Sequence, residues 1–439
     1  TLGNNAIGNY EWQSIYSNAK YVFGNSLATG VAISSIANRN LTWETTQISN
    51  VGIDFGFLDN RLTGTVDGYY KLTTGILYKP DMYFAVGTAS GPRENIANVT
   101  NCGIEVELGW RDRIGDFDYS IKGNMSYNRN RVSKYKGKLE EGWKDGKYVS
   151  NLGDVSTGGT TRVIEGHEIN EWYLPDVYKG SGNYFNSDGS VDKNGGPRDG
   201  MIRTVDDLKW VKAMIAEGYQ FYPSQRVAKD ALWYGEYIYA DANGDGIYGN
   251  SYDSVFQGSS STPKYNYGIQ FSLGWKGIDF SIMLQGIGRQ NMYPSTEDLA
   301  FWGPYSRPYT SFIPKDFMSK VWSESNPDAY FPRPRGYVAL KSNRELGAVN
   351  DRYLQNVGYC RLKNLTIGYT LPKKWLERMR MTKFRIYFSG ENLATVTALK
   401  SRYIDPEQAS SSLSWKNGRG AGMVYPYART FTFGLDITF

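Results

Sequence analysis

The clearest local chemistry of this sequence lies in residues 241–246, which read DANGDG. Side-chain oxygens at the first, third and fifth positions and glycine at the sixth have the spacing of a twelve-residue calcium-binding loop. Ile247 would offer its carbonyl at the seventh position, and Asp253 stands one residue beyond the twelfth, which is Tyr252. The alternative is an Asn-Gly/Asp-Gly turn without metal. We expect a calcium clamp without catalytic role, formed by Asp241, Asn243, Asp245, Ile247 and Asp253, and no other cofactor.

Residues for acid-base or nucleophilic catalysis are scarce. His167 is the single histidine, which excludes histidine-rich metal centres and leaves a Ser/His hydrolase dependent on that side chain. Glu165 and Glu168 lie nearby without a nucleophile at a recognisable spacing, so we expect a solvated loop histidine. Gly286 and Gly288 end an apolar run with no helical pattern after them, unlike a phosphate-binding loop. The sequence predicts that the protein is not an enzyme.

The composition excludes two more classes. The 439 residues are 40% hydrophobic, yet no apolar run reaches the roughly twenty residues that a membrane-spanning helix needs. The net charge of +5, from 49 basic and 44 acidic residues, is too small and too dispersed for a nucleic-acid-binding protein.

Alternation of apolar and polar residues recurs along the chain and predicts β-strands. At the C-terminus, apolar residues occupy every odd position from 431 to 439 and polar residues or glycine every even one. We count nine such strands, of which the first eight form pairs joined by the short turns 58–61, 111–116, 276–277 and 372–382. The strands are Val51 to Phe57, Leu62 to Leu72, Ile104 to Trp110, Phe117 to Tyr127, Tyr265 to Trp275, Ile278 to Gly286, Leu365 to Leu371, Phe384 to Phe388 and Thr430 to Phe439.

Short and long connections alternate strictly, and the long ones span roughly 73–101, 129–264, 287–358 and 393–428. Barrels of bacterial outer membranes have short periplasmic turns, long extracellular loops, and strands of roughly ten residues that are apolar outside and polar inside. A soluble β-sandwich, the alternative, has no reason to gather its long loops at one end. We therefore predict an all-β protein, a transmembrane antiparallel β-barrel with long extracellular loops, the longest of which contains residues 241–246.

Two cysteines, Cys102 and Cys360, lie near the presumed extracellular ends of the third and seventh predicted strands. Four strand spacings of about 4.8 Å place them nearly 20 Å apart. A disulfide allows at most roughly 7 Å between the Cα atoms. We therefore expect free thiols.

Four groups of residues follow one another in the order of a known family. They are NLTWETT at 40–46 with VGIDFG at 51–56; DANGDG at 241–246 with Pro263, Tyr267-Gly268 and WKGID at 275–279; RLKNL at 361–365 with GYTLP at 368–372, Asn392-Leu393 and DPE at 405–407; and Tyr425-Pro426 with Arg429-Thr430 before Phe439. This order resembles that of the SusC/RagA-type TonB-dependent outer-membrane transporters, over nearly the whole chain.

The resemblance implies that residues 1–439 are the C-terminal part of a TonB-dependent receptor β-barrel. About nine strands of a larger, 22-stranded barrel would lie here, with the plug domain and the N-terminal strands absent from this chain. Such a set has two unpaired edges, and unpaired backbone in lipid costs several kcal/mol per group. We therefore expect a second chain with the plug and remaining strands to pair with the strand that starts near Gln47 and with Thr430 to Phe439.

The resemblance also implies TonB-dependent active import of oligosaccharides or peptides across the bacterial cell outer membrane. The expected partners are a SusD-like surface lipoprotein, TonB acting through the missing N-terminal part, outer-membrane lipids, and a glycan or peptide substrate, with no nucleic acid. A passive outer-membrane porin, or a surface receptor that binds ligand without transport, is the alternative, although loops of roughly 130 and 70 residues are long for a simple pore.

Aromatic residues of the long loops are the candidates for ligand contact, because sugars and peptides both stack on aromatic rings. Equally, most of them could pack the loops onto one another. They are Trp143, Trp172, Trp210, Trp233, Tyr234, Trp302, Tyr305 and Trp322.

Overall fold

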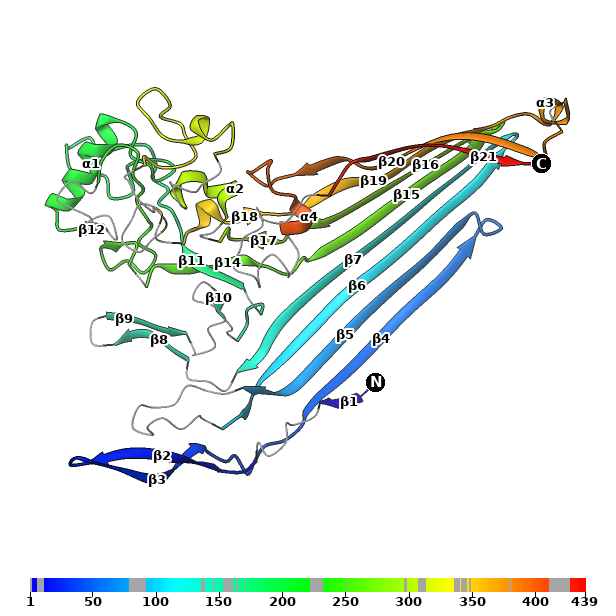
Figure 1. Cartoon of the computed structure of the whole chain (residues 1–439). Helices are drawn as coiled ribbons and strands as arrows, with labels where there is room; N and C mark the ends of the chain where they lie inside the picture. Colours follow the sequence, from blue (N-terminus) through cyan, green and yellow to red (C-terminus); the bar gives the residue numbers. More distant parts are fainter. Residues whose placement is uncertain are drawn as a thin grey trace.

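One antiparallel sheet of ten strands dominates the computed structural model (Figure 1), in the order β1-β4-β5-β6-β7-β15-β16-β19-β20-β21. The structure describes residues 2–5, 12–78, 92–135, 139–144, 147–152, 161–162, 165–169, 171–221, 232–250, 252–295, 298–306, 313–334, 340, 346, 349–378, 380–409 and 427–439. The strands are β1 Leu2–Asn5, β4 Glu44–Phe57, β5 Leu62–Tyr78, β6 Glu94–Ile114, β7 Phe117–Tyr135, β15 Tyr265–Trp275, β16 Ile278–Gly288, β19 Tyr359–Thr370, β20 Lys383–Thr397 and β21 Thr430–Thr438. Each predicted segment lies in one of these strands, apart from Leu371 and Phe439, which each follow a strand by one residue.

The register of the strands carries one apolar face across the sheet. Ile53 on β4 lies opposite Val66 on β5, and Val66 lies opposite Val106 on β6. At the other side of the sheet, Ile386 on β20 lies opposite Leu435 on β21. Ile53, Ile386 and Leu435 expose 65%, 50% and 61% of their surface. An apolar face of this extent is a liability in water and is what the lipid-facing side of a membrane barrel requires.

The opposite face of the sheet is polar and is cross-linked between strands. Arg385 on β20 lies between two carboxylates, with Nη2 2.6 Å from Asp279 Oδ2 and Nη1 3.3 Å from Asp436 Oδ2. On β5, the Thr65 hydroxyl donates a hydrogen bond of 2.7 Å to Asp54 Oδ1 on β4. The alternation that predicted the strands therefore corresponds to one apolar and one polar face.

One edge of the sheet corrects a prediction. Leu2 to Asn5 (β1) pair with β4, so that Leu2 lies opposite Gln47 and Asn5 opposite Glu44. We predicted that a second chain would supply the strand next to β4. Over these residues β1 of the same chain supplies it, so this part of the prediction is wrong. At the other edge, β21 pairs with β20 within the described residues. Closure into a barrel and its total number of strands stay predictions.

The described parts of the long connections gather at one end of the strands and the short turns at the other, called here the loop end and the turn end (Figure 1). In the first turn, Leu58, Asp59 and Asn60 all have positive φ, and Arg61 N–H donates to Leu58 O at 3.1 Å. The second turn is shorter than the predicted 111–116, because the ladder continues to the pair Ile114 and Phe117. Charged residues at 111–113 had hidden the end of that strand.

The remaining elements lie in the connections and bury most of the apolar core. They are β2 Ile15–Phe23, β3 Ser26–Ser35, β8 Leu139–Lys144, β9 Lys147–Leu152, β10 Thr161–Arg162, β11 Glu171–Pro175, α1 Val205–Ala216, β12 Gln220–Phe221, β13 Ile247–Tyr248, β14 Ser254–Ser260, β17 Asn291–Met292, α2 Leu299–Trp302, η3 Gly303–Tyr305, η4 Met318–Lys320, η5 Asp351–Tyr353, β18 Gln355–Asn356, α3 Lys373–Arg378 and α4 Pro406–Ala409. Within the described ranges, none of the helices has the length and hydropathy of a membrane span.

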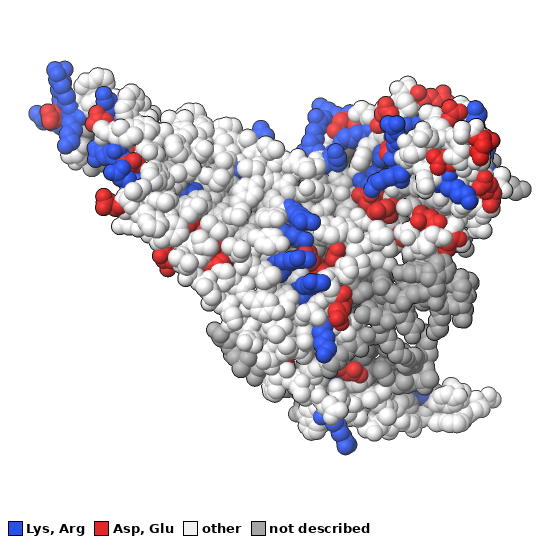
Figure 2. All heavy atoms as spheres, turned by 180° about the vertical axis from the view of Figure 1, so that it is seen from behind, with Lys and Arg blue, Asp and Glu red and all other residues white. Residues whose placement is uncertain are grey.

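Seen from behind (Figure 2), the charges gather on the folded loops, in a band along the loop ends of the strands, and at the tip of the turn end.

Cys102 and Cys360 are both free thiols, as predicted.

Candidate functional site

The connections from β7 to β15 and from β16 to β19 fold into a packed loop body at the loop end, and this body is the candidate site. Its first aromatic core is centred on Trp302 and Tyr353, both fully buried, and Phe331 stacks on Tyr353 with ring centroids 5.6 Å apart. Its second core surrounds α1, where Tyr178 stacks on Trp210 at 5.5 Å. Two such cores give the loops a defined shape.

The helix α1 begins at a capping box that is visible in the sequence TVDD at 204–207. Thr204 Oγ1 accepts a hydrogen bond from Asp207 N, and Asp207 Oδ2 accepts one from Thr204 N at 2.8 Å. Tyr184 donates to the other carboxylate oxygen at 2.9 Å. The cap fixes the start of the helix, and Trp210, further along it, enters the second core.

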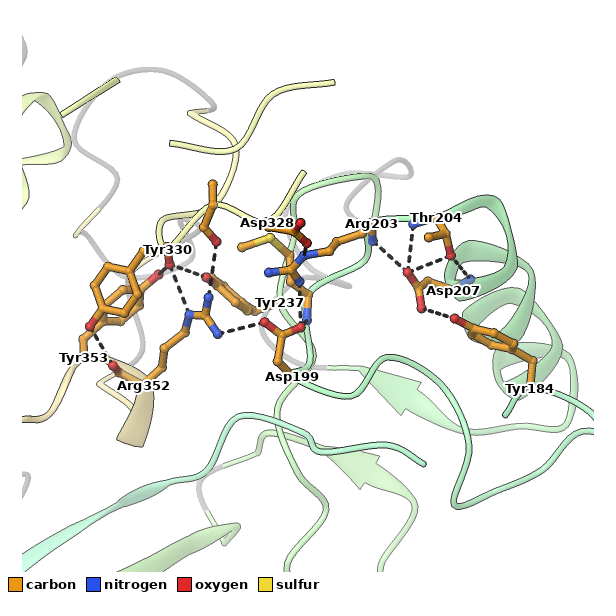
Figure 3. Close-up of polar contacts among 12 residues, drawn as sticks. Tyr184, Asp199, Arg203, Thr204, Asp207, Tyr237, Asp328, Tyr330, Arg352 and Tyr353 are labelled. Atoms are coloured by element: carbon orange, nitrogen blue, oxygen red, sulfur yellow. Dashed lines mark hydrogen bonds and ion pairs between the residues drawn. The ribbon is translucent and has the colours of Figure 1, made fainter. Parts of the chain in front are cut away.

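An arginine network joins the two connections (Figure 3). Asp199 accepts from Arg203 Nη1 at 2.6 Å and from Arg352 Nη1 at 3.1 Å. Arg352 belongs to η5, and its Nε also donates to Tyr330 O at 3.1 Å. The guanidinium carbon lies 4.9 Å from the centre of the Tyr237 ring, a cation–π geometry.

Burial keeps the tyrosines of this network neutral. It raises the pKa of Tyr330 to about 12 and raises that of Tyr237 further. Both hydroxyls therefore act as donors, Tyr237 to Tyr330 O at 2.7 Å and Tyr330 to Arg352 O at 2.8 Å.

Five of the eight aromatic candidates are buried in the loop body. Trp172, Trp210, Trp302, Tyr305 and Trp322 expose 5%, 0%, 0%, 3% and 8% of their surface. Their rings have no face free for a ligand in this arrangement, so they pack the loops together, which is the alternative that the sequence left open. The side chain of Trp143, in β8, lies outside the described residues.

Trp233 and Tyr234 remain as candidates. Trp233 is 41% exposed, Tyr234 is half-buried, and their rings meet edge-on with centroids 5.2 Å apart. Lys212 Nζ lies 5.9 Å from the Trp233 ring centre. Together they form an exposed spot with an aromatic face and a cation, anchored because Tyr234 also packs against both cores. Ligand contact at this spot stays a prediction.

The DANGDG segment forms a tight loop closed by its own side chains. Asp241 Oδ1 accepts from Gly244 N at 2.8 Å, and Oδ2 accepts from Gly246 N at 2.9 Å. Asn243 Nδ2 donates to Asp245 Oδ2 at 3.1 Å. Among the described residues, no three His, Cys, Asp or Glu side chains form a group that could hold a metal. The calcium assignment stays a prediction that rests on spacing.

The carboxylate of Asp253, predicted to coordinate calcium, instead accepts hydrogen bonds from the backbone of this loop. Asp253 is fully buried, and its carboxylate accepts from Ala242 N at 2.8 Å, Gly249 N at 2.7 Å and Asn250 N at 2.9 Å. Burial raises its pKa to about 6, against the opposing effect of these N–H donors. Ile247 starts β13, which pairs with β12.

Calcium binding is tested by hydrogen exchange of residues 236–256 in the complete protein. At a calcium concentration about ten times the dissociation constant, exchange should slow about tenfold relative to chelator. Asp241→Ala with Asp245→Ala should remove that protection because it removes two of the oxygen ligands, whereas Asp188→Ala, in another exposed turn, should keep it. Equal exchange of the unaltered loop with calcium and with chelator would refute the metal.

Sequence reasoning gave no role to a cluster of charges that the structure brings together at the loop end of β19. Arg361, 3% exposed, pairs with Asp405 and, through Nη1 at 2.8 Å, with Glu407. Lys363 Nζ also contacts Glu407 at 2.8 Å. The cluster borders a cavity of about 840 Å³ that is also lined by Asn392, Thr395, Tyr403 and Tyr427. The sequence signal that could have predicted this cluster was the pair of motifs RLKN at 361–364 and DPE at 405–407, which contain its basic and acidic residues.

The sequence predicted a solvated loop histidine, but His167 contacts other side chains and keeps 38% of its own side chain exposed. Its Nδ1 lies 3.1 Å from Glu171 Oε2, and its ring stacks on Phe256 with centroids 3.7 Å apart. Glu168 pairs with Lys264 at 2.6 Å, both nearly buried. The histidine thus helps to join β11 to β14.

Comparison with known proteins defines the class of protein to which this architecture is related. No family model matches the chain. It is 26% identical over 447 residues to TonB-dependent receptor P3 of Formosa agariphila, covering 100% of this chain and 38% of that receptor. It is 25% identical over 432 residues to TonB-dependent receptor SusC of Bacteroides thetaiotaomicron, covering 96% and 34%.

Solved structures support the fold. The RagAB peptide importer in its open-open state superposes with a TM-score of 0.60 at 20% identity, over 100% of this chain and 39% of that one. Another structure of the RagAB peptide transporter gives 0.58 at 21% identity. The chain spans about two fifths or less of the length of these relatives.

These matches confirm the SusC/RagA-type resemblance for a portion of such a protein, and with it the outer membrane of Gram-negative bacteria as its location. The relatives are receptors and transporters, which fits a protein that is not an enzyme.

Proposed function

We propose that this chain is the barrel part of a transporter that imports oligosaccharides or peptides across the outer membrane in a TonB-dependent step. The observation that carries the proposal is the match to TonB-dependent receptors over 96–100% of the chain. SusC is one of these relatives, and the RagAB structures are those of a peptide importer. Either substrate class fits the exposed aromatic spot at Trp233 and Tyr234.

In this proposal the two faces of the sheet have different surroundings. The apolar face, with Ile53 and Leu435, lies against lipid. The polar face, with Arg385 between Asp279 and Asp436, lines the lumen and meets the plug, which a second chain or another part of the protein supplies. The loop body forms the outer mouth, where a SusD-like lipoprotein closes over the ligand. TonB acts through the plug-bearing part.

A passive porin or a receptor without transport is the second candidate function. The packed loop body at the mouth speaks against a porin, because its buried cores fill space that free diffusion would need. A receptor without transport would share the mouth and the ligand spot, so only the energy dependence of uptake separates it from an importer.

Trp233→Ala is expected to weaken ligand binding by about 2- to 13-fold, because one aromatic stacking contact contributes about 0.5–1.5 kcal/mol. The measurement is calorimetric titration of the complete purified transporter with a defined oligosaccharide pool and, separately, a defined peptide pool. Phe185→Ala is the matched control, since Phe185 is also on the loop body and 44% exposed. Equal ligand affinities of the Trp233 variant and the unaltered protein would show that Trp233 does not contact the ligand.

A further inference from the structure

The turn end carries a group of exposed basic residues, called here the basic turn cluster. Lys276 lies in the turn between β15 and β16, and Lys373, Lys374, Arg378 and Arg380 lie in α3 or just after it. All five are exposed, and Glu377 is the one acidic residue between 373 and 380. Figure 2 shows Lys and Arg gathered at this tip, at the upper left. The net charge of the cluster is therefore strongly positive.

These charges are available to an external anion. The ion pairs recorded beside the cluster join Lys383 and Arg385 to Asp279 and Asp436. Within the described part of the chain, no carboxylate lies at ion-pair distance from the five members of the cluster. Lys276 Nζ lies over an aromatic ring, 5.6 Å from the centre of Trp275. Among the residues that the structure describes, the cluster therefore has no carboxylate partner.

The short helix α3 holds these residues in a fixed place. Leu376 is its buried residue, 4% exposed, and the following turn closes where Met381 N–H donates to Leu376 O at 3.0 Å. Arg380 adopts a positive φ of 53° within this closure. Trp375 points its ring into solvent, 55% exposed, beside Lys374. A large exposed indole next to lysines suits the boundary between lipid and water.

In a membrane that covers the apolar face, the cluster would lie at the height of the lipid headgroup layer. The apolar face ends at Trp275 and Tyr369, which remain 47% and 38% exposed. Lys276 follows Trp275 by one residue, and Lys373 follows Tyr369 by four. In strands tilted by roughly 45°, four residues advance about 10 Å along the membrane normal. The headgroup layer of one leaflet adds about 5–8 Å to the hydrocarbon core, and long basic side chains reach back toward it.

We propose that the basic turn cluster binds the phosphate groups of anionic phospholipids in the leaflet at the turn end, with Trp375 seated at the interface. Clusters of Lys and Arg next to a membrane-embedded segment are attracted by anionic lipid, and the effect adds up residue by residue. The contact would fix the depth and tilt of the sheet. Only the naming of this leaflet as the periplasmic one rests on the proposed function.

The test uses the complete transporter in phosphatidylcholine vesicles that contain either dibrominated phosphatidylglycerol or dibrominated phosphatidylcholine. Quenching of tryptophan fluorescence gives the association constant of the anionic lipid relative to the neutral one. We expect a preference of at least about fivefold for phosphatidylglycerol, since each basic residue at an anionic surface contributes roughly that factor. The variant K373Q/K374Q/R378Q/R380Q should lower the preference to about one, and K373Q/K374Q should give an intermediate value.

The matched control is K179Q/K193Q/K209Q/K315Q, which removes the same charge from exposed positions on the loop body. It should keep the preference, as should K373R/K374R. The proposal would be overturned by any of three results: no preference in the unaltered protein, an unchanged preference in the fourfold cluster variant, or an equal loss in the control. An unchanged preference in the fourfold cluster variant would leave a periplasmic protein as the partner of the cluster. Ligand titration separates the two proposals, since failure to bind ligand would count against import without changing the lipid result.

Discussion

Arg361→Ala is expected to lower the free energy of unfolding by about 3–5 kcal/mol, because it leaves the buried carboxylate of Asp405 without its partner. Arg361 and Asp405 expose 3% and 8% of their side chains, and the guanidinium also holds Glu407 at 2.8 Å and Thr395 Oγ1 at 2.9 Å. The loss should detach the segment around α4 from β19. Chemical unfolding of the complete protein in detergent, followed by tryptophan fluorescence, measures it.

Lys363→Ala is the matched control for Arg361→Ala. Lys363 shares Glu407 with Arg361, but its side chain is 21% exposed and Arg361 continues to pair with Glu407 after the change. We expect a loss below about 1 kcal/mol. Equal stability of the Arg361 variant and the unaltered protein would show that the cluster contributes nothing to holding the loop.

The second large effect is expected at Arg352, whose replacement by Ala should release the two halves of the loop body from each other. Its side chain is 16% exposed and bonds to Asp199 at 3.1 Å and to the carbonyls of Tyr330 and Ala329 at 3.1 and 3.3 Å. Asp199 keeps 43% of its side chain exposed, so we discount the cost to about 2–3 kcal/mol. Hydrogen exchange should become about 30- to 150-fold faster in α1 and η5 and stay unchanged in the sheet.

Lys179→Ala provides the comparison, because Lys179 pairs with Asp351 at 3.0 Å in the same region but is 66% exposed. Its removal should change exchange less than about fivefold. If both variants leave α1 equally protected, the arginine network does not join the connections.

The strands of the sheet could be predicted because their physical signal is local. Ile53 on β4 and Leu435 on β21 each alternate with polar residues or glycine along their own strand. This period of two residues predicts both the strand and which of its faces is apolar. The end of β6 was missed where Arg111 and Arg113 interrupt the pattern. Charged residues at this turn end remove the contrast between polar and apolar positions on which the prediction of the strand depended.

The loop body could be predicted only in part, because its contacts join residues far apart in sequence. Trp302 and Trp233 look alike in the sequence, yet one is fully buried and the other 41% exposed. Arg361 and Asp405 were noted as motif residues, but their contact depends on how the last long connection folds back. The capping box at Thr204 was a local signal for α1 that the strand analysis passed over.

The hairpin β2–β3 was also missed, for a different reason. Tyr16, Val22, Val31 and other residues on it are apolar and exposed, so the segment lacks the regular contrast between two faces. A pair of strands without a third gains little stability from its own side chains.

Uptake measured with and without TonB tests the central claim most directly. Cells that carry the complete transporter and its lipoprotein partner would be given the labelled oligosaccharide pool and the labelled peptide pool, and accumulation would be compared with that in the same cells lacking TonB. The proposal predicts that one pool accumulates only in cells with TonB, while surface binding persists in both. Accumulation at the same rate without TonB would contradict it in favour of a passive pore, and binding without any TonB-dependent accumulation would identify a receptor.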